Sequence, residues 1–303
     1  MVRSMELAPR ITVCVCTFKR SDSLAELLRN LLLQRTDGCF THDIVVVDND
    51  EARSAEQVVR EFAATSQIPT TYCVEPDQNI ALARNMAVGR AEGGLLAFID
   101  DDEVPTTDWL YQLFHTRAKY QVDGALGPVL ARFQQVPAEW VVKGKFFDRP
   151  RHRTGHPIKW SEARTGNVLV AKDVCRAMDP PFRPQFGSGG EDVDFFRRAT
   201  ELGRRFVWSD EAVVHELVPP HRCTRRFLMH RALLRGSNFP KQSAHRVRNI
   251  LKSVIAVPCY TLALPLLAVR GHHVFVTYLV KLLDHSSRLL AMAGVRLSTE
   301  RQH

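Results

Sequence analysis

The sequence predicts an α/β fold in which helices flank a mostly parallel sheet and an apolar helical tail follows. Three observations lead to this prediction. Short β-branched runs alternate with segments of helical spacing through residues 11–100, and this order of elements builds a parallel, doubly wound sheet. Each predicted strand is followed by polar residues, and two long apolar runs lie near the end of the chain.

The first half has the more regular pattern. Residues 11–16 and 44–47 are short apolar runs rich in β-branched residues, which is typical of buried strands. A helix is expected from Ser21, whose hydroxyl is placed to cap it, because leucines follow at helical spacing. The further elements expected are a helix over residues 55–64, a strand over 70–74, a helix over 79–91 and a strand over 95–100. The polar residues after these strands should meet at one edge of the sheet.

The second half is richer in glycine and proline. Residues 136–164 form a basic and aromatic stretch without a clear period, and so long a loop in a compact domain is typical of a lid or an acceptor surface. A glycine loop at residues 187–190 leads into a helix expected to end near Leu202, with Gly203 as its stop. The further elements expected are a helix over 108–120, extended chain over 125–133, and strands over 165–170 and 206–209.

Four acidic residues in a row, Asp100, Asp101, Asp102 and Glu103, end the strand that begins at residue 95. Adjacent like charges raise one another's pKa, so the run is costly unless a cation or hydrogen-bond donors compensate it. Carboxylate oxygens suit Mg²⁺ or Mn²⁺, with a nucleotide phosphate completing the shell. The alternative is a solvated acidic turn that caps a helix starting near residues 106–107.

Composition limits the classes of function. The chain has 303 residues, enough for one large domain or a domain with an appendage, and a formal net charge of +8. Lysine and arginine are scattered, so no nucleic-acid partner is expected, and the basic clusters at residues 149–153 and 222–235 suit a membrane surface or an anionic substrate. The 7 cysteines include no Cys-x-x-Cys pair, so we expect reduced thiols in a cytosolic protein, and no secretory signal is expected at the N-terminus.

The tail has two apolar runs. Residues 253–269 carry no charge and include two prolines, and a second run covers residues 274–280. The first run is borderline in length for a spanning helix. With basic residues at 246, 248, 252 and 270 beside it, we expect a pair of membrane-embedded or interfacial helices. The alternatives are a buried helical hairpin and a dimer interface.

Two further acids, Glu191 and Asp192, follow the glycine loop at the start of a predicted helix. The helix dipole favours their ionised form, which keeps a general base available at neutral pH. With a metal ion held by the aspartates to stabilise a departing diphosphate, this set meets the needs of a sugar-nucleotide transferase. The alternative is that the two acids only cap their helix.

A series of segments, in this order, resembles the family 2 glycosyltransferases, which are inverting enzymes of the GT-A fold. The matching segments are residues 14–20, 45–50, 79 with 83–85, 98–103, 190–194 and 215. Within that family the chain most resembles bacterial exopolysaccharide glucosyltransferases of the succinoglycan type. That closer resemblance rests on residues 127–129, 165–167, 188–192 and 214–216.

The resemblance implies a role for each matching residue. Asp192 would be the catalytic base, with Glu191 as its neighbour or as a hydrogen-bond partner of the acceptor. Asp102 would contact the metal ion, with His215 as a further ligand, although a structural imidazole is an equal alternative for His215. The residues expected to bind the donor are Thr17, Arg20, Asp48, Asp50, Asn79, Arg84, Asp100 and Asp101.

The prediction is therefore a metal-dependent inverting glycosyltransferase on the cytoplasmic face of the inner membrane. It would move a sugar, expected to be glucose, from a UDP-sugar to a saccharide or lipid-linked saccharide in exopolysaccharide or cell-surface glycan synthesis. Residues 1–103 would bind the nucleotide-sugar, 104–225 would bind the acceptor and catalyse, and 226–303 would associate with the membrane.

Two rival functions remain open. One is a nucleotidyltransferase that makes the sugar nucleotide; it is disfavoured because residues 17–20, after the first strand, contain no glycine for a phosphate loop. The other is a membrane-bound scaffold that binds saccharide without catalysis. Trp140 and Trp160 could stack on acceptor sugars or lie in a core.

Overall fold

The computed structural model describes residues 8–187, 189–242 and 246–295, so Ser188 of the glycine loop and the last residues of the predicted tail lie outside the described residues. The chain divides into two compact units. The first unit comprises Met1–Leu130 and Arg149–Glu216, and the second comprises Ala131–Asp148 and Leu217–His303. The division into 1–103, 104–225 and 226–303 stays a prediction.

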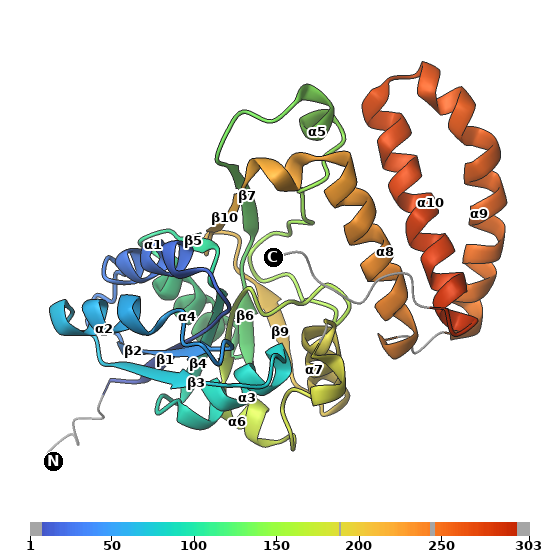
Figure 1. Cartoon of the computed structure of the whole chain (residues 1–303). Helices are drawn as coiled ribbons and strands as arrows, with labels where there is room; N and C mark the ends of the chain where they lie inside the picture. Colours follow the sequence, from blue (N-terminus) through green and yellow to red (C-terminus); the bar gives the residue numbers. More distant parts are fainter. Residues whose placement is uncertain (1–7, 188, 243–245, 296–303) are drawn as a thin grey trace, which may run out of the picture. The chain divides into compact units, whose positions relative to one another are not determined.

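A seven-stranded sheet in the order β3-β2-β1-β4-β8-β6-β9 forms the centre of the first unit (Figure 1). Strands β3, β2, β1 and β4 pair in parallel, and β8 is antiparallel to both of its neighbours. The predicted mostly parallel sheet is confirmed. The strands are β1 (Arg10–Thr17), β2 (Thr41–Asp48), β3 (Thr70–Val74), β4 (Leu95–Asp100), β6 (Gly124–Leu126), β8 (Asn167–Ala171) and β9 (Phe206–Trp208).

Helices cover both faces of this sheet, with α1 and α2 on one face and α3 and α6 on the other (Figure 1). The helices of the unit are α1 (Ser21–Leu31), α2 (Glu56–Thr65), α3 (Ile80–Arg90), α4 (Trp109–Tyr120), α6 (Lys172–Arg176) and α7 (Glu191–Glu201), with the 3₁₀ turn η1 (Pro184–Phe186). The leucines that predicted α1 are buried on one side of it. The predicted cap by Ser21 is wrong. The helix begins at Ser21 itself, and Arg20 occupies the cap position, since Leu24 N–H donates to the carbonyl of Arg20 at 3.0 Å.

The stretch predicted as extended over 125–133 is two strands, β6 and β7 (Val129–Phe133). The break falls at Gly127, where a Cβ would lie 2.1 Å from the carbonyl oxygen of Ala212, so the chain passes too close to another backbone for any other residue. Strand β7 belongs to a second, three-stranded sheet with β5 (Glu103–Pro105) and β10 (Val214–Val218). Sequence analysis missed β5.

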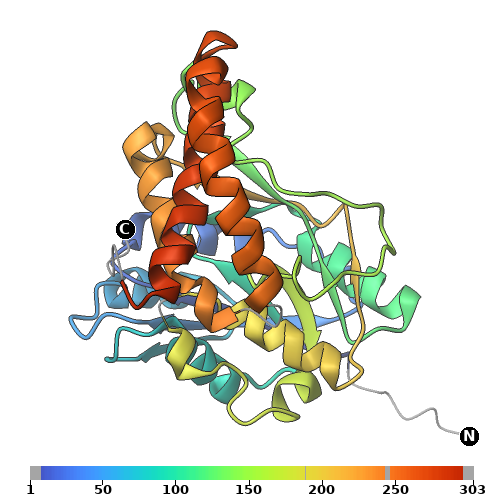
Figure 2. The ribbon, with the colours of Figure 1, turned by 90° about the vertical axis from the view of Figure 1, so that its right-hand side faces the viewer.

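In the second unit, a small apolar cluster holds together helices from distant parts of the chain. It comprises Val141, Phe147, Val218, Leu228 and Val276. The elements of this unit are α5 (Glu139–Lys143), η2 (Pro220–Cys223), α8 (Arg225–Gln242), α9 (Arg246–Val269) and α10 (His272–Met292). Helices α9 and α10 run side by side (Figures 1 and 2).

The predicted apolar helical tail is confirmed. Among the described residues, one helix, at Ile250–Val269, is long and apolar enough to cross a membrane by length and composition, and 6% of its most apolar window is buried. The second predicted run lies within α10, which does not reach that threshold. Trp140 packs against the apolar cluster of the second unit and Trp160 against the core of the first.

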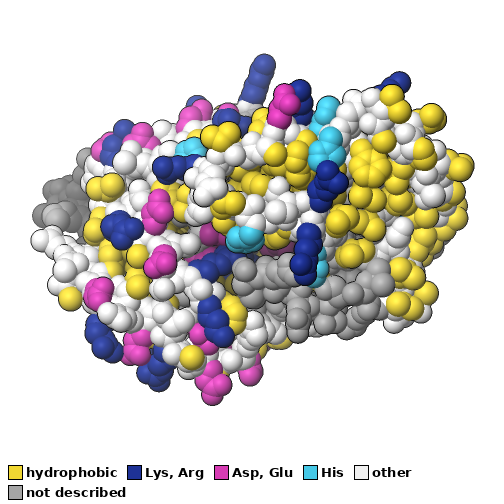
Figure 3. Space-filling view, turned by 45° about the horizontal axis from the view of Figure 1, so that its top comes forward, with side chains coloured by type: hydrophobic (Ala, Val, Ile, Leu, Met, Phe, Trp, Pro, Cys, Tyr) yellow, Lys and Arg dark blue, Asp and Glu magenta, His cyan; other side chains and the backbone are white. Residues whose placement is uncertain are grey.

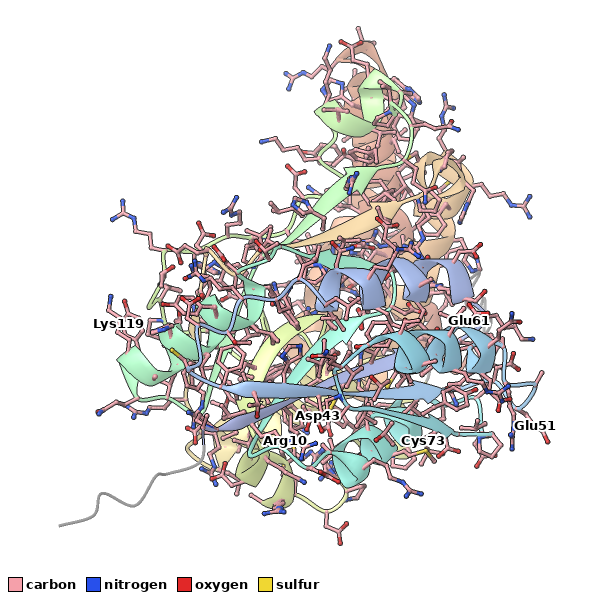
Figure 4. All side chains as sticks on the ribbon, turned by 90° about the vertical axis from the view of Figure 1, so that its left-hand side faces the viewer. Arg10, Asp43, Glu51, Glu61, Cys73 and Lys119 are labelled. Carbon is pink, nitrogen blue, oxygen red and sulfur yellow. The ribbon has the colours of Figure 1, made fainter. Side chains whose placement is uncertain are left out.

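The amino ends of the central strands are fixed by an ion pair. Arg10 on β1 lies 3.0 Å from Asp43 on β2, and Thr12 donates to the same carboxylate at 2.8 Å. Figure 4 shows Arg10 and Asp43 together, whereas Glu51, which follows β2, lies at the opposite end of the strands. Arg10 and Asp43 therefore lie away from the carboxyl edge of the sheet, where other polar residues gather.

Candidate active site

The carboxyl ends of three central strands meet at one edge of the sheet, as predicted. The parallel register aligns Thr17 at the end of β1 with Asp48 at the end of β2. It also aligns Cys16 with Asp100 at the end of β4. The acidic run at residues 100–103, here called the aspartate turn, starts at this edge.

Protein donors compensate the negative charge of the aspartate turn. Thr17 Oγ1 donates to Asp101 at 2.8 Å, and one nitrogen of Arg20 donates to both Asp101 and Asp102 at 3.0 Å. Burial raises the pKa of Asp101 to about 6, an effect that the charge of Arg20 opposes and that of Asp102 reinforces. Asp101 is 5% exposed and Glu103 2% exposed. The alternative of a solvated acidic turn is therefore wrong for these two residues.

Glu103 stabilises the aspartate turn by a hydrogen bond to its backbone. Its carboxylate accepts a hydrogen bond from the backbone N–H of Asp100 at 3.0 Å. Burial raises its pKa well above the usual value, and the negative charge of Asp100 adds to this effect while Arg149 opposes it. Arg149 in turn pairs with Glu216 on β10. In the sequence Glu103 is only one of four consecutive acids, whereas the structure places it at the start of the short buried strand β5.

Gly166 leaves no room for a side chain beside the aspartate turn. A Cβ at this position would lie 2.8 Å from an oxygen of Glu103 and 3.1 Å from an oxygen of Asp100. The carboxylate of Glu103 is held by its hydrogen bond from the backbone N–H of Asp100, so it cannot move away without losing that contact. This contact explains why a glycine precedes Asn167 here.

We expect Gly166→Ala to reduce stability, because overpacking a close contact costs about 1–3 kcal/mol. Chemical unfolding of both forms measures the difference in free energy. Gly94→Ala is the matched control, since a Cβ there meets nothing within 4 Å. Equal stability of the two variants would show that the turn yields to the extra methyl group.

Arg84 connects the aspartate turn with the acidic pair at the start of α7. Its guanidinium is buried, pairs with Glu191 and lies 3.3 Å from an oxygen of Asp100. The adjacent Asp192 has a different environment: its side chain is 18% exposed, compared with 6% for Glu191, and lies 3.7 Å from Arg164. The two adjacent acids therefore differ in accessibility, and Arg164 is a neighbour that sequence analysis missed.

Glycines position this acidic pair. Gly190, the residue before α7, has φ +95°, and Gly189 has φ +128°, both in the region that L side chains rarely adopt. The prediction that a glycine loop delivers Glu191 and Asp192 at a helix N-terminus is confirmed.

The other predicted donor-binding residues lie at the same edge but make structural hydrogen bonds. Asp48 is fully buried and accepts from Ala55 N–H at 2.7 Å and Tyr72 O–H at 3.0 Å. Asp50 is also buried. Asn79 accepts from two N–H groups at the start of α3 and donates to Pro184 at 3.0 Å. Their contact with a donor stays a prediction.

His215 lies on β10, opposite Val104 of β5 in the antiparallel register. Within the part of the chain that the structure describes, no three His, Cys, Asp or Glu side chains are gathered as a metal site. The joint role of Asp102 and His215 as metal ligands therefore stays a prediction.

Comparison with known proteins identifies the family. The model of Glycosyl transferase family 2 matches residues 12–169. The chain is 32% identical over 253 residues to the succinoglycan biosynthesis protein ExoM of Rhizobium meliloti, covering 81% of this chain and 80% of that protein.

Solved structures share the fold. The mannosyltransferase PcManGT from Pyrobaculum calidifontis, in complex with GDP-Man and Mn²⁺, has a TM-score of 0.64 at 18% identity over 99% of this chain and 92% of that chain. S. aureus TarS 1–349 in complex with UDP-GlcNAc has a TM-score of 0.56 at 14% identity over 95% and 93%. The sequence resemblance is thus confirmed: with a GT-A-like sheet and a family match over more than half of its length, this chain belongs to glycosyltransferase family 2.

Proposed function

We propose that this glycosyltransferase moves a sugar from a UDP-sugar to a hydroxyl group of a saccharide acceptor, with inversion at the anomeric carbon and Asp192 as the general base. The observation that carries the proposal is the asymmetry of the acidic pair. Arg84 holds Glu191 in a buried ion pair, whereas Asp192 is partly exposed at the same helix end. An acceptor can therefore reach Asp192 more easily than Glu191.

The reaction needs a base and a leaving-group site on opposite sides of the sugar. The acceptor hydroxyl would give its proton to Asp192 as its oxygen bonds to the anomeric carbon, and the bond to the diphosphate oxygen would break. Arg84 pairs with Glu191 on α7 and with Asp100 on the aspartate turn. This shared guanidinium would fix the separation of the two sites, which is what an in-line displacement requires.

The carboxylates of the aspartate turn fit a divalent cation. Asp100 is half-exposed and Asp102 is partly exposed, and hard cations prefer such oxygen ligands. Asp101 is buried and paired with Thr17 and Arg20. Asp100 and Asp102 also pair with arginines but keep more exposed side-chain surface, so these two are the residues that would hold Mg²⁺ or Mn²⁺. When bound, the cation would neutralise charge on the departing diphosphate.

The comparisons support the finer parts of this proposal to different degrees. Exopolysaccharide synthesis is supported by the relative named for succinoglycan biosynthesis. A uridine nucleotide is supported by the structures of TarS with UDP and UDP-GlcNAc, while the PcManGT structure holds GDP-Man. Glucose as the sugar and a lipid-linked saccharide as the acceptor follow from the sequence resemblance and the apolar tail.

A donor screen tests the proposal. Purified full-length protein is incubated with Mg²⁺ or Mn²⁺ and a panel of UDP- and GDP-sugars, and nucleotide release is measured with and without EDTA. We expect metal-dependent release of UDP, fastest from UDP-glucose. Release of GDP alone would overturn the donor assignment. Pyrophosphate release from UTP and a sugar phosphate would favour the nucleotidyltransferase, and no turnover would favour the scaffold.

We also propose that the second unit binds the cytoplasmic face of the inner membrane through α9. Leu262 and Leu266 on this helix are 78% and 75% exposed, and they belong to a series of exposed apolar residues along it. Deleting the tail is a poor test, because α10 contributes Val276 to the apolar cluster of this unit. Substitutions on the exposed side of α9 leave that cluster intact.

We expect Leu262→Lys combined with Leu266→Lys to move the protein from the membrane fraction to the soluble fraction, because two charges replace apolar groups that would contact lipid. Fractionation of cells that express each form measures the change. Leu33→Lys, at a leucine that is 60% exposed in the first unit, is the matched control and should leave the protein in the membrane fraction. Wild-type protein that is soluble and monodisperse without detergent would refute membrane binding.

A further inference from the structure

The side of α9 that faces away from α10 is apolar along its length. Its exposed residues recur every three or four positions, so they lie along one side of the helix. Figure 3 shows hydrophobic side chains gathered on the surface that α9 and α10 form. We call this set the outer face of α9: Leu251, Val254, Ile255, Pro258, Leu262, Pro265, Leu266 and Val269.

We propose that α9 lies in the plane of the membrane surface, with its outer face in the boundary between headgroups and acyl chains, and does not cross the bilayer. The proposal rests on the membrane association proposed above and adds the orientation of α9 relative to the membrane. Three independent features of the second unit favour an in-plane helix over a spanning one.

The first feature is the charge of the helix packed against α9. Ser253 shares a hydrogen bond with His285 of α10 at 2.9 Å, and the rings of Tyr260 and Tyr278 lie 5.5 Å apart. The two helices are therefore antiparallel, and the charged stretch of α10, residues 281–288, lies beside the first half of α9. Crossing the bilayer would carry these residues into hydrocarbon, where a central charge costs about 2.5–3.5 kcal/mol on insertion scales.

The second feature is the position of cations at both ends of the uncharged run. Lys252 and Arg270 are exposed and bracket residues 253–269. The stretch that is long enough to span, Ile250–Val269, includes Lys252, and the uncharged run alone is about 25 Å long at 1.5 Å per residue, against roughly 30 Å of hydrocarbon. In the plane of the surface both cations would lie at headgroup depth, where anionic lipids attract them.

The third feature is the pair of prolines on the outer face. Proline has no N–H, so Pro258 and Pro265 leave the carbonyls of Val254 and Thr261 without the donor that a regular helix supplies four residues later. In hydrocarbon such a carbonyl on a lipid-facing side costs several kcal/mol. At the interface, water can donate to it. A shallow helix therefore accommodates both prolines with water as the donor, whereas a spanning helix would need local bending or hydroxyl donors to pair the same carbonyls.

Nitroxide labels at exposed positions along α9 measure depth directly. Cys259 is exposed on α9 and serves as the central label site. The two end sites are introduced as Leu251→Cys and Val269→Cys. Each end site is labelled in a separate protein, in which Cys259 is replaced by serine. The other partly exposed cysteines, Cys16, Cys39, Cys73 and Cys223, are replaced by serine in all forms. Each full-length protein is reconstituted into vesicles of phosphatidylcholine and phosphatidylglycerol, and the accessibility of the nitroxide to oxygen and to a water-soluble relaxant gives its depth.

We expect all three labels at a similar shallow depth, about 5–10 Å into the headgroup and acyl boundary. A deep label at Cys259 with shallow labels at both ends would overturn the proposal in favour of a spanning helix. A label at Leu33→Cys, an exposed position in the first unit, is the control and should stay in water. Labels that all remain in water, together with a dimer in solution, would overturn the proposal in favour of a second copy of the chain covering the outer face.

Nucleotide release is measured on the wild-type protein in the same vesicles, because Cys16 lies beside Asp100 at the edge of the site. The labels report depth whether or not sugar is transferred, so failure of the in-plane helix and failure of the proposed reaction give separate results. Reduced flotation with vesicles that lack phosphatidylglycerol is expected from the two flanking cations. Equal flotation with both kinds of vesicle would show that the flanking cations do not lie at headgroup depth.

Discussion

Asp192→Asn is expected to lower kcat by about 10²–10⁴-fold with little change in the Kd of the donor, because a positioned general base contributes a factor of that size. Asp192 is partly exposed at the N-terminus of α7, and asparagine keeps its shape while removing its ability to accept a proton. Steady-state transfer rates and donor titrations of the purified variant measure the two quantities. A scaffold that only binds would show no transfer in either the wild type or the variant.

Glu191→Gln is the control for this result. Glu191 is buried against Arg84, so its substitution should disturb that pair and, through it, the position of Asp100. We therefore expect a change in donor affinity that Asp192→Asn does not cause. If Glu191→Gln instead has the larger effect on kcat at unchanged donor affinity, the roles of the two acids are exchanged. If neither variant slows transfer, the two acids only cap α7.

Asp102→Asn is expected to abolish metal-dependent donor binding and, with it, transfer. The substitution removes a carboxylate charge from the aspartate turn and keeps its size, so the unfolding temperature should change little. Titration with UDP in the presence and absence of Mn²⁺ measures the effect. Asp77→Asn, at an exposed aspartate, should bind as the wild type does. Normal turnover of Asp102→Asn after treatment with EDTA would exclude the proposed metal role.

Local sequence patterns predicted most of the first unit. Strand β3 has the predicted bounds, and the leucines of α1 are buried as their spacing indicates. Buried β-branched runs and leucine stripes carry this information because burial on one side of an element leaves a period in the sequence. The cap of α1 was wrong because Arg20, not Ser21, precedes the helix, and its side chain pairs with Asp101 and Asp102 instead of capping it.

The candidate site was predicted as a set of residues but not as a set of contacts. Arg84 and Glu191 are 107 positions apart, and nothing near either one indicates that they form a buried pair. The support of the aspartate turn by Glu103 was missed for the same reason, since four consecutive acids give no sign of which one turns inward. Only the folded chain distinguishes the acid that stabilises the turn from those that remain accessible.

The shared guanidinium of Arg84 makes the two halves of the site thermodynamically dependent. Because it pairs with both Glu191 and Asp100, the loss of either partner changes its interaction with the other. Residues with a common partner typically show interaction energies of about 0.5–3 kcal/mol. The effects of Glu191→Gln and Asp100→Asn on donor affinity should therefore not sum in the double variant. Two positions 91 apart in sequence are then energetically coupled, and a double-mutant cycle on donor affinity measures the coupling between α7 and the aspartate turn.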